Sequence, residues 1–260
     1  MRKNKNVWLA LAVVCLLATT ATADVTLTMS NLAANGWKAT ATNVWGGNPD
    51  ASVTQTTDYG CGNFKFRTGS MPTSWIFQWA GISTNAFSGL SLSSITSVKI
   101  RNFGQAGDNA LNWQPPTFTW VVDKGDGNQR CITWQPWNNG NPREPGVWHE
   151  YNAATTGMWR VYETGSNYGS LASLKAALPN AFFADTSVLP LDWGYASQHA
   201  FNVGNCPLYD EDRAWFSGAS GYVDWFKVGV NGVETTYNLV PEPSTLAAMC
   251  MGLVGLAGTI

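Results

Sequence analysis

Short runs of β-forming residues, separated by glycine, asparagine, aspartate and proline, recur along most of this 260-residue chain. Residues 98–103 (Val-Lys-Ile-Arg-Asn-Phe) alternate apolar and polar side chains, as a strand with one solvent-facing side does. Similar runs occupy residues 25–29, 64–67 and 75–79. Many short strands with turn residues between them indicate an antiparallel β protein.

Two hairpins are the clearest local features. Residues 222–230 and 233–239 flank Asn231-Gly232, and an Asn-Gly pair between apolar runs is the strongest short-range signal for a type I′ hairpin turn. Residues 117–122 and 130–134 flank a loop rich in aspartate and glycine. Both patterns predict antiparallel strand pairs.

One short helix is expected near residues 170–178. Leu171, Leu174 and Leu178 fall on one helical face, Ser170 can cap the start, and Pro179 stops the continuation. Residues 181–184 then return to a strand. We find no repeat of fixed period, which disfavours solenoids and propellers.

Together these elements predict an all-β fold, a jelly-roll-like antiparallel β-sandwich with one short helix. The size of residues 24–239 suits one domain, because sandwiches reach roughly 200–250 residues as single units. The order of elements and the run 221–230 resemble exported jelly-roll modules of the carbohydrate-binding or legume-lectin-like kind. A fold likeness does not by itself imply function.

The N-terminus has the three parts of a secretory signal peptide. Arg2, Lys3 and Lys5 are basic, residues 8–18 are apolar, and residues 21–23 (Ala-Thr-Ala) supply small side chains for cleavage. We therefore expect residues 1–23 to form a signal helix that is removed before Asp24, and the protein to be exported.

The C-terminus combines a short polar motif with an apolar segment. Pro241, Glu242, Pro243 and Ser244 precede an uncharged run to Ile260. This arrangement over residues 240–260 resembles the PEP-CTERM sorting signal of exported bacterial proteins. The resemblance implies a C-terminal transmembrane helix, transient membrane anchoring, processing by an exosortase-type enzyme, and a final place at the cell surface or in the extracellular matrix. The family's terminal arginine cluster is absent here, so a plain anchor without processing is the alternative.

Composition narrows the range of partners. Charged residues make up only 12% of the chain and the formal net charge is −2, so no basic surface is available for nucleic acid. Cys61, Cys131 and Cys206 remain between the two terminal segments. One disulfide and one thiol is the simplest arrangement in an exported protein, and the pairing stays open.

Tryptophan is the most unusual component, with 14 residues, all but Trp8 in the body of the chain. Indole faces can stack on sugar rings, although most tryptophans serve as large core residues. Trp45, Trp113 and Trp137 are the surface candidates, because polar turn residues surround them, and Asn138 and Asn139 could bond sugar hydroxyls. Strand positions instead favour a core role for a second group: Trp75, Trp120, Trp134 and Trp225.

Asp123, Asp126 and Asn128 have the composition of an acidic calcium loop. They also fall where a hairpin turn is expected, and we favour the turn. No cofactor is predicted, apart from a structural calcium as the weaker alternative.

Two other polar groups are candidates for catalysis. Residues 210–213 (Asp-Glu-Asp-Arg) form the densest acidic cluster, and Glu144, His149, Glu150 and Glu163 lie close together in sequence. Glycosidase carboxylates must stand about 5–10 Å apart, and an acid–base pair must reach one substrate. We expect a solvated loop and strand-edge positions, respectively, with no assigned catalytic residue.

The leading hypothesis is an exported surface or matrix protein that binds extracellular polysaccharide without catalysis. Two alternatives remain. The first is a polysaccharide-active enzyme, a glycoside hydrolase or lyase, which needs two carboxylates in a tryptophan-lined groove. The second is a purely structural matrix component, which requires every indole to be buried.

Overall fold

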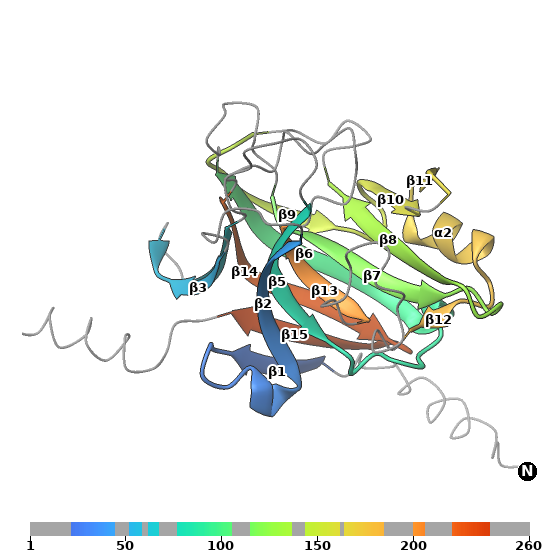
Figure 1. The fold of residues 1–260 in the computed structure, drawn as a ribbon, viewed down its shortest axis with the longest axis horizontal. Helices are drawn as coiled ribbons and strands as arrows, with labels where there is room; N and C mark the ends of the chain where they lie inside the picture. The colour runs from blue at the N-terminus through green and yellow to red at the C-terminus, as the bar shows by residue number, and fades with distance from the viewer. Residues whose placement is uncertain are drawn as a thin grey trace, which may run out of the picture.

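The computed structural model describes residues 22–44, 52–58, 62–67, 77–105, 115–136, 144–161, 164–184, 200–205 and 220–239. In this part of the chain two β-sheets pack face to face as a sandwich (Figure 1). The predicted all-β sandwich is confirmed at this level.

The first sheet has seven strands, and its centre is the long strand β14 (Ser220–Val230). β6 (Ile95–Gln105) pairs with one edge of β14, and β9 (Trp148–Asn152) pairs with β6. Along its other edge β14 pairs first with β4 (Asn63–Arg67) and then with β15 (Val233–Leu239). β3 (Ser52–Thr56) pairs antiparallel with β4, whereas β1 (Thr22–Leu27) pairs parallel with β15.

The second sheet has eight strands, in the order β11-β10-β8-β7-β13-β5-β2, with β12 beside β7. All its described pairings are antiparallel. Its strands are β2 (Trp37–Val44), β5 (Phe77–Thr84), β7 (Thr117–Asp123), β8 (Gln129–Gln135), β10 (Met158–Val161), β11 (Ser166–Tyr168), β12 (Phe182–Phe183) and β13 (Phe201–Asn205).

Aromatic rings fill the space between the two sheets. Trp120 of β7 and Trp159 of β10 have ring centroids 4.3 Å apart, and Phe201 of β13 lies 6.4 Å from Phe226 of β14 in the opposite sheet. All four side chains are fully buried. Large rings dominate core burial energetics, so they hold the sheets together in a chain with few charges.

The local predictions agree with the observed elements. Asn231 (φ 50°) and Gly232 (φ 84°) both have positive φ in the turn that joins β14 and β15, as a type I′ turn requires. The second predicted hairpin is β7–β8. The expected helix is α2 (Leu171–Ala177), where Ser170 and Ser173 cap each other's backbone N–H groups.

Two short 3-10 helices complete the described elements, η1 (Ala33–Asn35) and η3 (Leu92–Ser94). Among the described residues no helix is long and apolar enough to cross a membrane. The apolar part of the predicted signal peptide and the whole C-terminal sorting segment lie outside the described residues. Their roles therefore stay predictions.

Strand β1 overlaps the predicted cleavage position. Thr22 and Ala23 pair with Glu234 and Thr235 of β15, and the residues from Asp24 to Leu27 continue the same register. Cleavage before Asp24 would remove the first two pairs and leave the last four, including the fully buried Leu27.

Candidate functional site

Several strands of the eight-stranded sheet end on the same side of the sandwich. Gly204 of β13 is in register with Thr117 at the start of β7 and with Gly81 of β5. Val44, the last residue of β2, pairs with Phe77, the first residue of β5. The β7–β8 register, in which Thr119 faces Thr133, places the last residue of β8 at this end as well. We call this side the loop end.

The three surface tryptophan candidates are adjacent in sequence to the loop end. Trp45 follows the last residue of β2, Trp113 precedes the start of β7, and Trp137 follows the end of β8. Since neighbouring strands lie about 4.8 Å apart, the ends of β7 and β8 are about 5 Å apart and those of β2 and β7 about 14 Å. Trp45, Trp113, Trp137, Asn138 and Asn139 themselves lie outside the described residues.

A buried hydrogen bond ties the two sheets together near the loop end. Asn102 of β6, which is fully buried, donates through its side-chain Nδ2 to the carbonyl oxygen of Pro116 at 2.7 Å. Pro116 directly precedes β7, so this bond fixes the entry of β7 relative to the seven-stranded sheet. The strand that follows Trp113 is thereby anchored to both sheets.

A row of polar side chains crosses the outer face of the eight-stranded sheet. Ser83 of β5 is in register with Asn202 of β13, Asn202 with Thr119 of β7, and Thr119 with Thr133 of β8. Their sequence neighbours belong to the core, so side-chain alternation places these four residues on the opposite face. We call Ser83, Asn202, Thr119 and Thr133 the polar row.

The polar row is buried, and its hydroxyl groups lack partners. Ser83, Asn202 and Thr119 have no exposed area, and Thr133 is 6% exposed. Asn202 donates through Nδ2 to the carbonyl oxygen of Thr119 at 2.9 Å. The hydroxyl oxygens of Ser83, Thr119 and Thr133 make no hydrogen bond. Each such group costs about 1–3 kcal/mol unless water or a ligand satisfies it.

Beside the polar row the sheet has no side chains over two strands. Gly81 of β5 and Gly204 of β13 pair in register one step nearer the loop end. A Cβ atom on Gly204 would lie 2.3 Å from the carbonyl oxygen of Ala80, so only glycine fits. At this step neither β5 nor β13 carries a side chain, and both glycines are buried.

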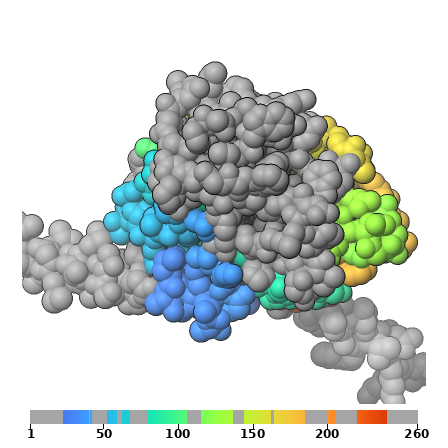
Figure 2. Space-filling view, in the orientation of Figure 1, coloured from blue at the N-terminus to red at the C-terminus, as the bar shows by residue number. Residues whose placement is uncertain are grey.

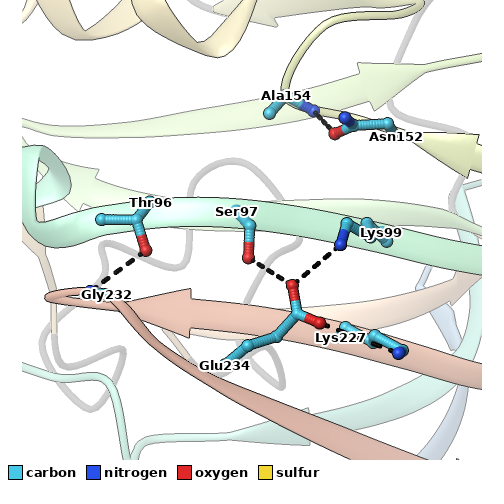
Figure 3. A network of polar contacts seen from close by, with 8 residues as sticks. All are labelled: Thr96, Ser97, Lys99, Asn152, Ala154, Lys227, Gly232 and Glu234. Atoms are coloured by element: carbon cyan, nitrogen blue, oxygen red, sulfur yellow. Dashed lines mark hydrogen bonds and ion pairs between the residues drawn. The ribbon is translucent and has the colours of Figure 1, made fainter. Parts of the chain in front are cut away.

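The outer face of the seven-stranded sheet is charged instead. Glu234 of β15 accepts hydrogen bonds from Ser97 at 2.9 Å and Lys99 at 3.0 Å, and its other oxygen lies 3.7 Å from Lys227 (Figure 3). Burial raises the pKa of Glu234, but these hydrogen bonds and the two lysine charges outweigh burial and lower it overall. The network joins β6, β14 and β15.

A second ionic cluster on the same face contains two carboxylates. Arg101 of β6 contacts Asp224 of β14 at 2.5 Å and Glu150 of β9 at 3.8 Å, and its guanidinium lies 5.1 Å from the ring centre of Trp148. Burial raises the pKa of Asp224, although Arg101 opposes the shift. Because both carboxylates face one permanent cation, we interpret the cluster as a link between three strands rather than as an acid–base pair.

The described tryptophans divide into two groups. Trp120 and Trp134 lie in the core as predicted. The core prediction for Trp225 is wrong: this residue is half-buried, next to a register shift between Val223 and Trp225. A β-bulge of this kind re-aims a side chain. The ammonium of Lys227 lies 5.3 Å from the ring centre of Trp225. Trp75 lies outside the described residues.

The acidic loop of residues 123–128 forms the hairpin turn between β7 and β8, which Figure 2 shows in green at the surface. Asp123 Oδ1 accepts hydrogen bonds from the backbone N–H groups of Gly125 and Gly127 at 2.7 and 3.1 Å. Asp126 pairs with Lys124 at 2.8 Å, and this contact is the main reason that its pKa falls to about 2. Hydrogen bonds and an ion pair within the turn thus engage both carboxylates. Calcium at Asp123, Asp126 and Asn128 stays a prediction.

The remaining polar candidates show no catalytic arrangement within the described residues. His149 of β9 contacts the backbone oxygen of Glu144 at 3.3 Å. No three His, Cys, Asp or Glu side chains of the described ranges lie close enough to hold a metal ion. Cys131 is buried in β8. Other sequence candidates lie outside the described residues: Cys61, Glu163, Cys206 and residues 210–213.

Sequence reasoning missed the polar row. Its members are single polar residues between apolar neighbours on four strands, and only the register brings them together. Alternation in residues 117–123 and 129–135 could have signalled a polar outer face, but not the order of the strands. The chain matches no protein-family model, no curated protein and no solved structure.

Proposed function

We propose that the protein is exported and binds extracellular polysaccharide without catalysis, through Trp45, Trp113 and Trp137, which adjoin in sequence the strands that end at the loop end. Its delivery would follow from the signal peptide of residues 1–23 and the PEP-CTERM-like segment 240–260, which an exosortase-type enzyme would process. The jelly-roll likeness fits such a role.

One observation carries the proposal. The strands that adjoin Trp45, Trp113 and Trp137 all end on one side of one sheet, although these residues are far apart in sequence. The ends of β2 and β8 are four strand spacings apart, about 19 Å, which suits an extended polymer better than a small molecule. Indole faces would stack on sugar rings, and Asn138 and Asn139 would bond the hydroxyls.

Trp148 and Trp225 are only partly buried, which argues against the purely structural alternative that requires every indole to be buried. The enzyme alternative needs two converging carboxylates. The Arg101 cluster provides two, but the guanidinium engages both. Binding without catalysis is therefore the function that the described geometry supports best.

The decisive experiment is affinity electrophoresis of the protein from Asp24 to Leu239 in gels that contain laminarin, dextran or alginate. We expect retardation by at least one polymer and a loss of affinity of about tenfold in Trp137→Ala, because one stacking contact is removed. Reducing-sugar assays should show no polymer cleavage.

Trp225→Ala is the matched control. It removes a partly buried indole from the seven-stranded sheet, whereas Trp45, Trp113 and Trp137 adjoin strands of the eight-stranded sheet, so retardation should not change. Free migration of the wild-type protein in every gel would refute glycan binding. An equal loss in Trp137→Ala and Trp225→Ala would place binding elsewhere.

A further inference from the structure

The turn between β14 and β15 contains a dipeptide with reactive chemistry. The backbone nitrogen that follows an asparagine can attack the Cγ atom of that side-chain amide, and glycine at the second position hinders the attack least, because it has no Cβ atom. Three Asn-Gly pairs occur in the sequence, at residues 35–36, 139–140 and 231–232. The structure describes the first and the third, and it places them in different environments.

At residues 231–232 the amide that would be attacked is free. Asn231 and Gly232 are both exposed, and among the described residues no hydrogen bond engages the Asn231 side chain. The attacking nitrogen is held only weakly. The N–H group of Gly232 donates to Thr96 Oγ1 at 3.3 Å, which is long for an N–H···O bond (Figure 3).

At residues 35–36 both reacting groups are engaged. Asn35 donates through Nδ2 to the carbonyl oxygen of Asn31 at 3.0 Å. The N–H group of Gly36 donates to the carbonyl oxygen of Ala33 at 3.1 Å and ends the helix η1. Since Asn35 and Gly36 are also exposed, hydrogen bonding rather than solvent access distinguishes this pair from the one in the hairpin.

We infer that Asn231 is a site of spontaneous covalent modification, deamidation through a cyclic imide. Gly232 N gives up its proton and bonds to Asn231 Cγ. The Cγ–Nδ2 bond breaks, and its nitrogen takes up a proton and leaves as ammonia. Water then opens the five-membered ring at either of its two carbonyl groups, which yields aspartate or isoaspartate. The reaction consumes only water, and it does not depend on glycan binding.

Thr96 acts as a restraint on this reaction. The ring nitrogen of the imide carries no hydrogen, so the bond from Gly232 to Thr96 must be lost before the ring closes. Folded protein should therefore react at Asn231 more slowly than unfolded protein does. Because only one weak bond opposes ring closure there, the reaction should still be faster than at Asn35, where two bonds must break.

The two products should affect the hairpin differently. Aspartate is a favoured residue before glycine in a type I′ turn, so it should fit. Isoaspartate adds a methylene group to the main chain of a two-residue turn whose flanking pair is Val230 with Val233. That extra atom should disturb the register between β14 and β15.

The test is incubation of the full-length protein in warm, mildly alkaline buffer, followed by peptide mapping with mass spectrometry. Each rate is divided by the rate of the same pair in urea-unfolded protein. We expect aspartate and isoaspartate at Asn231, and a relative rate at Asn35 at least about fivefold lower, because one more hydrogen bond must break there. Equal relative rates, or an inert Asn231 in folded protein while the unfolded chain reacts, would overturn the inference.

Thr96→Val removes the acceptor of the Gly232 N–H group and keeps the shape of the side chain. We expect about a fivefold faster reaction at Asn231, with no change at Asn35. Thr96→Ser, which keeps a hydroxyl, should react as the wild type does. If the rate at Asn231 is the same in all three proteins, Thr96 is no restraint and that part of the inference fails.

Asn231→Asp is the control for the products. This variant should melt at nearly the temperature of fresh wild-type protein, whereas wild-type protein that has accumulated isoaspartate should melt earlier. If isoaspartate at residue 231 leaves the melting temperature unchanged, the site is modified without consequence for the hairpin, and the expected disturbance of the register is wrong.

Discussion

At the scale of single residues, the outer face of the seven-stranded sheet holds two partly buried carboxylates with opposite pKa shifts. The side chains of Glu234 and Asp224 are similarly exposed, 20% and 15%. Glu234 has two lysines and a serine donor, so its pKa falls. Asp224 has one arginine and a repelling neighbour, Glu150, and burial keeps its pKa raised. Burial raises the pKa of both carboxylates, and only at Glu234 do the hydrogen bonds and the two lysine charges outweigh it.

Glu234→Gln tests the first of these sites. A lowered pKa in the folded state means that the carboxylate stabilises the fold above its ordinary pKa of 4.5, and that this contribution is lost as the pH falls through the lowered value. We expect the variant to lose about 1 kcal/mol of unfolding free energy at pH 7 and less near pH 3. Urea unfolding at both pH values measures the difference.

Glu150→Gln is the comparison for that experiment. The Glu150 side chain is 67% exposed and stands 3.8 Å from Arg101, so its ion pair should contribute less than about 0.5 kcal/mol. If Glu234→Gln loses the same unfolding free energy at pH 3 as at pH 7, the amide disturbs packing, and the ionisation of Glu234 is not the cause of the loss.

At the scale of elements, the close contact between β13 and β5 depends on one glycine. A Cβ atom on Gly204 would lie 2.3 Å from the Ala80 oxygen and 2.5 Å from the Gly81 Cα atom, and both are backbone atoms that cannot turn aside. Gly204→Ala should therefore force the strands apart and lower the unfolding free energy by about 3 kcal/mol or more. Chemical denaturation measures this loss.

Gly127→Ala distinguishes steric contact from a general intolerance of glycine replacement. Gly127 has a φ of +76°, but no atom lies within 4 Å of a Cβ placed there. Its cost should be the backbone penalty alone, about 1 kcal/mol. If the two alanine variants are equally stable, the close approach of β13 to β5 is not a constraint on the fold.

The same scale shows how far the sequence determines the structure. Both hairpins and α2 were predictable because their signals are local: Asn231-Gly232 for one turn, the acidic loop for the other, and a serine cap for the helix. The order of the strands was not predictable from the sequence. β13 inserts between β5 and β7, and β1 pairs with β15 from the opposite end of the chain. Such pairings depend on tertiary packing.

The candidate site also combines features with local sequence signals and features that depend on tertiary pairing. Polar turn residues mark Trp45, Trp113 and Trp137 in the sequence, but only the register shows that their strands end together. The bulge before Trp225 re-aims a strand residue that alternation had placed inside. The polar row required both the strand order and the register, so no local pattern could indicate it.

At the scale of the whole molecule, the sandwich places different chemistry on its two outer faces. One carries the ionic networks of Glu234 and Arg101, and the other carries buried hydroxyl and amide groups. The aromatic core between them holds the two sheets together.

The predicted cleavage before Asp24 would fall within β1 and so bears on the stability of the whole fold. β1 covers the edge of β15, and Val25 and Leu27 pack on the core. A protein that begins at Asp24 keeps four of the paired positions and should be nearly as stable as the full chain. One that begins at Thr28 loses the fully buried Leu27 and uncovers β15, at a cost of about 3 kcal/mol or more.

Differential scanning calorimetry and light scattering compare these two proteins, with Leu27→Ala in the longer one as an intermediate. The shorter protein should melt earlier and associate through the free edge of β15, because unpaired strand edges template pairing with other chains. Leu27→Ala should melt early without associating, since its backbone still covers that edge. Equal melting and monomeric behaviour in all three would show that β1 is dispensable, and that cleavage before Asp24 has no bearing on the stability of the sandwich.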